Sequence, residues 1–197
     1  MNLSFKSFLV GVLAGVLASF LLLVGLGFAI YFMAKNRVAD FEKAEVLLLA
    51  PDFPATSKLT VHGQAQWDWT LRTLDGKEVR LGDFRGKVLF VNFWATWCQP
   101  CVREMPAIGR LQASLKEERV AFLLITDEEA NTVQKFVKER KWSLPIYLNS
   151  GELPPGFNAI GVPTTFMVSP DGGIIYKRFG AAQWDDDSCR KFIRALL

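Results

Sequence analysis

Two cysteines, Cys98 and Cys101, are separated by two intervening residues in the stretch Trp97–Cys101. They follow an apolar, strand-like run, 88–95, and precede a helix-like stretch, 102–118. Because the first cysteine falls where a helix begins, unpaired amide N–H groups and the helix dipole would stabilise its thiolate. Such a pair can close a small disulfide ring and exchange electrons with the disulfide of another protein. The pattern predicts a thiol–disulfide oxidoreductase.

Other uses of this cysteine spacing fit the chain less well. A zinc site needs two more ligands, and only Cys189 and His62 remain, each single and remote in sequence. Haem attachment needs a histidine directly after the second cysteine, and Val102 stands there. A static disulfide across two residues closes so short a loop that it removes little entropy from the unfolded chain. Redox exchange is the favoured interpretation, and Cys189 is expected to be a partly buried free thiol.

The stretch Val91–Cys101 resembles the thioredoxin superfamily, and most of all its membrane-anchored, extracytoplasmic TlpA, ResA and CcmG (DsbE) branch. Pro106 resembles the proline that kinks the active-site helix in that superfamily. Gly161–Phe166 resembles the loop whose proline is cis and packs beside the disulfide. The resemblance covers residues 66–197 and implies a thioredoxin-like α/β fold, in which helices flank a central mixed β-sheet.

The motif residues have separate expected roles. Cys98, nearest the helix dipole, is expected to attack a client disulfide, and Cys101 to resolve the mixed disulfide that results. Pro100 lacks a backbone donor and has a fixed φ, which would hold the two sulfurs in register. Gln99 carries no charge, whereas strongly oxidising relatives have a histidine between their cysteines. The motif therefore favours a reductant over an oxidant.

The resemblance also implies roles outside the motif. In ResA-like proteins a buried glutamate at the position of Glu104 tunes thiol titration; a solvent-facing helix charge is the alternative here. Asn92 stands where cytosolic thioredoxins carry a buried aspartate, which leaves Glu104 as the nearest proton acceptor. Pro163, if cis, would present the backbone of Val162 for strand-like pairing with a client. Trp97 is expected to form part of the docking surface.

The N-terminal part of the chain predicts a membrane anchor. From Phe8 to Met33 there is no charged residue, and this run exceeds the roughly 20 residues with which a helix crosses a bilayer. A cleaved signal peptide is the alternative, but its apolar region is normally about 7–15 residues long and ends at a small-residue cleavage site. We expect an uncleaved anchor over 1–34, a juxtamembrane linker over 35–65 and the thioredoxin-like domain over 66–197.

The charges that flank this run do not fix its orientation, because Lys6 lies on one side and Lys35 and Arg37 on the other. The resemblance implies a single-pass protein of the inner membrane whose catalytic domain faces the periplasm or another extracytoplasmic space. A chain with three cysteines, two of them in the motif, fits an exported domain. The net charge of +3, with acids and bases interspersed, gives no indication of nucleic-acid binding.

Apolar periodicity and turn residues predict the remaining elements. After an added N-terminal hairpin, the expected order β–α–β–α–β–β–α is thioredoxin-like. The expected elements are the hairpin 67–81 with its turn at Asp75-Gly76, a strand 120–126, a helix 127–140, strands 164–168 and 174–179, and a helix 184–197.

The function predicted from these features is a membrane-tethered disulfide reductase that needs no metal and no cofactor beyond the disulfide of Cys98 and Cys101. Its expected partners are client thiols and disulfides, with apocytochrome c as the leading client by family analogy, and an unidentified membrane protein that donates electrons.

Three alternative functions fit the sequence less well. A thioredoxin-fold metallochaperone would need a wider cysteine spacing and a distal histidine. A peroxiredoxin-like peroxidase would place one cysteine in a threonine-containing loop, and Thr96 is wrongly placed for this. A purely structural tether leaves the cysteine pair unexplained.

Overall fold

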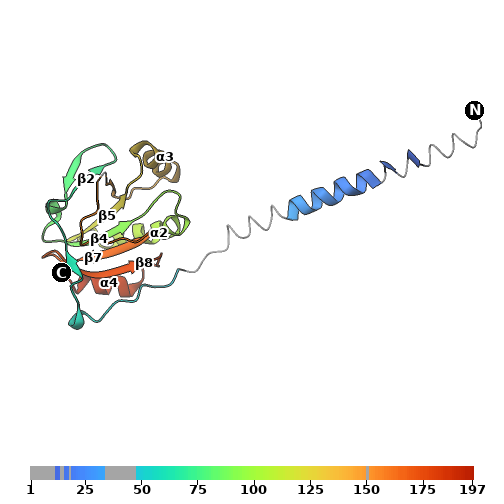
Figure 1. Ribbon diagram of the computed structural model, residues 1–197. Coiled ribbons are helices and arrows are strands. Elements are labelled where there is room, and N and C mark those ends of the chain that lie inside the picture. The colour runs from blue at the N-terminus through green and yellow to red at the C-terminus, as the bar shows by residue number, and fades with distance from the viewer. Residues whose placement is uncertain (1–11, 14–15, 18, 34–47, 150) are drawn as a thin grey trace, which may run out of the picture. The chain divides into compact units, whose positions relative to one another are not determined.

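The computed structural model describes residues 12–13, 16–17, 19–33, 48–149 and 151–197 (Figure 1). The chain divides into two compact units, Met1–Leu47 and Leu48–Leu197. In the first unit, residues 19–33 form a helix of mostly apolar, exposed side chains. None of the helices within the described residues is long and apolar enough to cross a membrane. Residues 1–11, 14–15, 18 and 34 of the predicted anchor lie outside the described residues.

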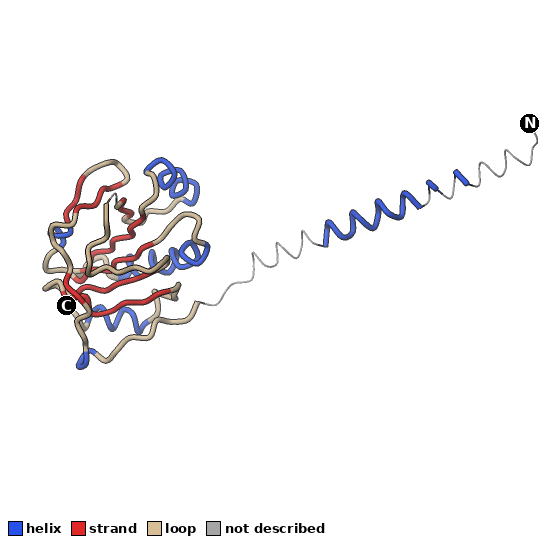
Figure 2. Tube along the Cα trace, viewed as in Figure 1, coloured by secondary structure: helices blue, strands red, loops and turns tan. Residues whose placement is uncertain are grey.

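The second unit is built on one mixed eight-stranded sheet in the order β1-β8-β7-β4-β5-β6-β2-β3 (Figures 1 and 2). Its strands are β1 (Gly63–Gln64), β2 (Thr70–Thr73), β3 (Glu78–Arg80), β4 (Val88–Phe93), β5 (Val120–Thr126), β6 (Ile146–Leu148), β7 (Thr164–Val168) and β8 (Gly173–Phe179). Its helices are α2 (Gln99–Ser114), α3 (Ala130–Arg140) and α4 (Asp187–Arg194), with short 3-10 turns at Thr56–Lys58 and Leu81–Phe84. This thioredoxin-like α/β arrangement confirms the predicted fold of the domain.

Strand β4 is the centre of the sheet, because it pairs parallel with β5 and antiparallel with β7. All six of its residues are buried, as expected of a strand covered on both faces. Phe90 faces a core to which α2, α3 and α4 contribute, whereas Leu89 and Val91 face a second core that includes the hairpin residues Trp69 and Leu71. This alternation places Asn92 on the same face as Phe90, toward the helices.

Two helix boundaries differ from the prediction. The active-site helix begins at Gln99 instead of residue 102, because Cys98 is its N-cap and the cysteine ring lies within the first turn. It ends at Ser114 instead of 118. The helix α3 starts at Ala130 instead of 127, because a turn that contains Glu128 intervenes.

The C-terminal part also departs from the prediction. Helix α4 covers only Asp187–Arg194 instead of 184–197, because Trp184 turns into the core and Asp186 caps the helix by accepting the Ser188 N–H. Strand β6 was not predicted, since three residues are too few to give a periodic pattern. The hairpin of β2 and β3 is confirmed, with Gly76 at φ 87° in its turn.

Residues 48–65 are part of the folded unit, which begins at Leu48, whereas the sequence analysis starts the domain at residue 66. The ring of Phe53 stacks on Phe192 at 4.4 Å and lies 4.8 Å from Tyr176. The carbonyl of Leu49 accepts the Gln183 N–H at 2.9 Å, and β1 pairs with β8. One aromatic side chain and a two-residue strand leave no periodic signal in the sequence.

The variant Phe53→Ala should lower the free energy of unfolding by about 2 kcal/mol, less than for a fully buried ring because Phe53 is half-buried. Urea unfolding of the full chain in detergent measures this. The matched control is Leu49→Ala, since the Leu49 side chain is 68% exposed and its backbone bond survives; it should change stability by less than about 0.5 kcal/mol. Equal stability of Phe53→Ala and the unaltered protein would contradict the packing of this segment.

Candidate active site

Cys98 and Cys101 form a disulfide at the N-terminus of α2. As the N-cap, Cys98 accepts the Cys101 N–H on its Sγ at 3.3 Å, and its carbonyl accepts the Val102 N–H at 3.0 Å. Both cysteines are buried, and Cys98 keeps the larger exposed fraction, 4% against 0%. The first sulfur therefore lies where helix N–H groups can stabilise negative charge.

The local sequence explains why the helix starts here. Cys98 has extended backbone angles, φ −81° and ψ 96°, as an N-cap requires. Pro100 occupies the first turn, where its missing N–H would have no partner inside the helix. Gln99 and Pro100 are both exposed, and Pro106 lies inside the helix, as the resemblance implies. Because Gln99 and Pro100 are both uncharged, no charged side chain lies between the two cysteines.

Glu128 binds the loop that leads to Cys98. Its carboxylate accepts the Thr96 N–H and the Thr96 hydroxyl, both at 2.6 Å, and the Thr126 hydroxyl at 3.3 Å. Glu128 could not be predicted as a site residue, because no fixed spacing in the sequence relates it to the cysteines. The parallel register of β4 and β5, which pairs Phe93 with Ile125, brings the two loops together. The available signal in the sequence is an acidic residue, Glu128, two positions after the end of β5, the strand that pairs with β4.

Glu104 lies one helical turn after Cys101 and is fully buried, so the alternative of a solvent-facing charge is wrong. Its Oε1 accepts the Asn92 Nδ2 at 2.9 Å. Its Oε2 accepts the Ala182 N–H at 3.0 Å and the Trp184 indole N–H at 2.7 Å. The carboxyl group thus has three donors, from β4 and from the loop before α4. Trp184 was not predicted as a site residue, because it lies 80 residues from Glu104 in sequence.

The surroundings of Glu104 shift its acidity. Burial raises the pKa of Glu104 from 4.5 to about 7, although the bonds from Trp184, Asn92 and Ala182 and the charge of Arg178 act in the opposite direction. A carboxyl group that titrates near neutral pH can accept or release a proton under physiological conditions. Glu104 follows Cys101 by three residues, so both lie on one face of α2.

Asn92 connects Glu104 to the strand after the cis-proline loop. Its Nδ2 donates to Glu104 and also to the Thr165 hydroxyl, at 2.8 Å. Its Oδ1 is buried and has no hydrogen-bond partner within the described part of the chain. The structure therefore brings Asn92 and Glu104 into direct contact.

The peptide bond between Val162 and Pro163 is cis, which confirms the expectation from the resemblance. Thr164 pairs with Phe93, so this loop lies at the end of the sheet from which β4 leads to Cys98. An open cavity of about 350 Å³ lies beside it, lined by residues that include Phe93, Trp94, Asp127, Ile160 and Val162. Trp97 is 71% exposed at the surface.

The other candidate ligands lie apart from this site. Burial raises the pKa of the free thiol of Cys189 to about 12, so the thiol stays protonated. His62 is exposed, and its backbone N–H donates to Ile174. Among the residues that the structure describes, no three His, Cys, Asp or Glu side chains gather as a metal site.

A model of the AhpC/TSA family matches residues 61–177. The chain belongs to this family. It is 33% identical over 156 residues to a thiol-disulfide oxidoreductase ResA of Bacillus cereus, covering 78% of this chain and 79% of that protein. It is 35% identical over 161 residues to ResA of Geobacillus thermodenitrificans, with coverage of 78% and 79%.

Among solved structures, the fold is similar to that of a thioredoxin-family thiol:disulfide interchange protein from Chlorobium tepidum TLS, with a TM-score of 0.57 and 26% identity. The match covers 71% of this chain and 99% of that one. Together with the disulfide at the start of α2, these likenesses confirm the predicted family. The protein is a thiol–disulfide oxidoreductase of the ResA type, and client protein thiols are the partners that this class implies.

The raised pKa of Glu104 predicts a pH-dependent stability. Between pH 4.5 and about 7 the folded protein holds this proton and the unfolded chain does not. The stabilisation of the folded state by this bound proton is complete below pH 4.5 and is lost as the pH rises toward 7. At about 1.4 kcal/mol per unit of pKa difference, the free energy of unfolding relative to Glu104→Gln should fall by about 3 kcal/mol across this window. Urea unfolding of both proteins at several pH values measures it; a constant difference would contradict the raised pKa.

Proposed function

We propose that this protein is a membrane-tethered, extracytoplasmic reductase of client disulfides that works through the dithiol of Cys98 and Cys101. The observation that carries the proposal is the arrangement at the start of α2. There a capping cysteine receives helix N–H groups, and its partner cysteine lies one turn from a buried carboxyl group. This arrangement supplies both an activated nucleophile and a proton acceptor.

The reaction begins with the reduced enzyme. The Cys98 thiolate attacks one sulfur of the client disulfide, a mixed disulfide forms, and the other client sulfur leaves and takes up a proton. Cys101 then gives its proton to Glu104 and attacks the Sγ of Cys98. The bond between Cys98 and the client breaks, and the second client sulfur leaves as a thiolate, which takes up a proton from water as Glu104 releases its own. The client gains two electrons, and the enzyme disulfide is restored.

Client binding would use the surface around the cis-proline. The backbone of Val162 would pair with the extended client segment, and the open cavity beside it would receive a client side chain. The exposed indole of Trp97 would cover the client close to Cys98. Pro163 would keep this backbone in place. Gln99 and Pro100, exposed and uncharged, leave the helix N-terminus as the main stabiliser of the Cys98 thiolate.

The direction of reaction follows from that uncharged motif. A histidine between the cysteines would stabilise the thiolate and make the disulfide strongly oxidising; neither Gln99 nor Pro100 can do so. Because the Cys98 thiolate is less stabilised here, the reduced dithiol gives up its electrons to client disulfides more readily. A reductase must itself be reduced again, and outside the cytoplasm a membrane protein that relays electrons would do this.

The proposed location and client rest on the sequence. The uncharged run from Phe8 to Met33 supports a single-pass anchor in the inner membrane, and the resemblance to the ResA and CcmG branch supports an extracytoplasmic domain. The same resemblance supports apocytochrome c, before haem attachment, as a client.

Cys101→Ser should accumulate client proteins as mixed disulfides on Cys98, because no second thiol is present to release them. Cys98→Ser should trap none and lose reductase activity. Non-reducing electrophoresis, followed by reduction and mass spectrometry of the shifted bands, measures both. The control is Cys189→Ser, since the buried thiol of Cys189 stays protonated; it should leave activity unchanged. Absence of any trapped species with Cys101→Ser would contradict the proposal.

Two alternatives are tested with the same preparations. Steady turnover of hydrogen peroxide would support a peroxidase, the alternative that the AhpC/TSA match makes relevant. Copper retained after gel filtration by the reduced protein would support a metallochaperone.

A further inference from the structure

The loop between β8 and α4 supplies two of the three donors to Glu104. Both act on the same oxygen, Oε2, which accepts the Ala182 N–H at 3.0 Å and the indole N–H of Trp184 at 2.7 Å. The backbone donor is independent of residue type, whereas the indole donor depends on a tryptophan at position 184. A side chain outside the motif, 80 residues from Glu104 in sequence, thus contacts the carboxyl group next to the redox pair.

The indole of Trp184 cannot turn away from this contact. The side chain is fully buried, and its ring packs edge-to-face on Phe90, with ring centres 5.0 Å apart and planes at 89°. Phe90 belongs to the central strand β4, which is itself fixed on both sides by the sheet. A buried N–H group that lost its acceptor would leave an unsatisfied donor in an apolar core, which is unfavourable.

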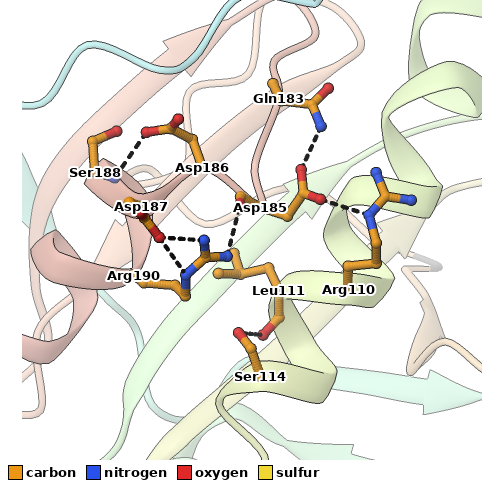
Figure 3. Close-up of polar contacts among 9 residues, drawn as sticks. All are labelled: Arg110, Leu111, Ser114, Gln183, Asp185, Asp186, Asp187, Ser188 and Arg190. Atoms are coloured by element: carbon orange, nitrogen blue, oxygen red, sulfur yellow. Dashed lines mark hydrogen bonds and ion pairs between the residues drawn. The ribbon is translucent and has the colours of Figure 1, made fainter.

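The loop is also fastened to α2, the helix that carries Cys101 and Glu104. Figure 3 shows the Asp185 carboxylate between the Arg110 guanidinium of α2 and the Gln183 side chain. The backbone carbonyl of Asp185 accepts a bond from Arg190 of α4. These contacts hold the residues on either side of Trp184, so the indole N–H keeps its place relative to the helix.

The groups that face Glu104 favour its ionised form. From β8, Arg178 contributes a positive charge, and from β4, Asn92 contributes an amide N–H. On α2 itself, Cys101 is the titratable neighbour once the disulfide is reduced. A protonated carboxyl group needs an acceptor for its own hydrogen, but Trp184 and Ala182 offer only donors. Removal of the indole N–H therefore destabilises the ionised form of Glu104 more than its neutral form.

We propose that Trp184 is a positioning residue for the redox site, whose buried indole N–H holds the Glu104 carboxyl group in place. Because this bond favours the carboxylate, Glu104 should release its proton at a lower pH than it would without the indole. The hydrogen bond from Trp184 to Glu104 is present in the folded structure whatever the protein's function. Its effect on catalysis rests on the proposed function, in which Glu104 accepts the proton of Cys101.

The test is the variant Trp184→Phe, which removes the N–H group and keeps an aromatic ring against Phe90. Titration of Glu104 is followed in the full chain in detergent by infrared spectroscopy of the protonated carboxyl group, with Glu104→Gln as the reference spectrum at each pH. Because a hydrogen bond to a charged group is lost, the midpoint should rise by about one pH unit in Trp184→Phe.

The matched control is Trp94→Phe. Trp94 is also buried, but its indole N–H has no hydrogen-bond partner among the described residues, so the same chemical change should leave the midpoint where it is. An unchanged midpoint in Trp184→Phe, or equal shifts in both variants, would overturn the proposal.

A second measurement covers the case in which Trp184→Phe does not fold. The indole ¹⁵N–H resonance of Trp184 in the unaltered protein should shift with pH at the Glu104 midpoint, and should not do so in Glu104→Gln. A resonance that stays constant through the titration of Glu104 would overturn the proposal.

The pH profile of client reduction separates this inference from the proposed function. If Glu104 serves Cys101, the profile of Trp184→Phe should shift together with the infrared midpoint. A shifted infrared midpoint with an unchanged activity profile would contradict the role of Glu104 in catalysis and would support the hold of Trp184 on the carboxyl group.

Discussion

A carboxyl group with no access to water lies one helical turn below the disulfide, and it constrains the structure around it. An isolated carboxylate in an apolar core is strongly unfavourable, so Glu104 can ionise there only with donors in place. Asn92, Ala182 and Trp184 provide them. Burial and these donors act against each other, which leaves the pKa of Glu104 at about 7 instead of at either extreme. This balance gives the site a carboxyl group that titrates near neutral pH.

The sheet topology makes that balance possible. Asn92 reaches Glu104 because it follows Phe90 by two residues on β4 and faces α2; a slip of one residue in register would turn the amide to the opposite face. The antiparallel pairing of β4 with β7 puts the cis-proline loop at the same end of the sheet as the cysteines, and parallel β5 brings Glu128 to the loop before Cys98. One central strand thus positions the disulfide, the cis-proline loop and the carboxyl group.

Features with a local or repetitive signal could be predicted from the sequence, and features set by tertiary contact could not. The strand, the dithiol motif and the helix occur consecutively, so Cys98 and Cys101 could be placed in advance, whereas the buried Glu104 followed from the resemblance. The cis-proline followed from the resemblance. Glu128 and Trp184 act on residues far from them in sequence, and only the folded sheet and the loop before α4 bring them into contact. Segment 48–65 packs through Phe53 and a two-residue strand, too little for a periodic pattern.

The reduction potential of the Cys98–Cys101 couple decides whether this dithiol donates electrons to client disulfides or accepts them. The full chain in detergent would be equilibrated in defined thiol buffers, and its redox state followed by tryptophan fluorescence and by alkylation of free thiols. For a dithiol that reduces its clients, we expect a value near or below that of thioredoxin, about −270 mV. A value approaching about −120 mV would identify an oxidant that forms disulfides and would contradict the proposed reductase function.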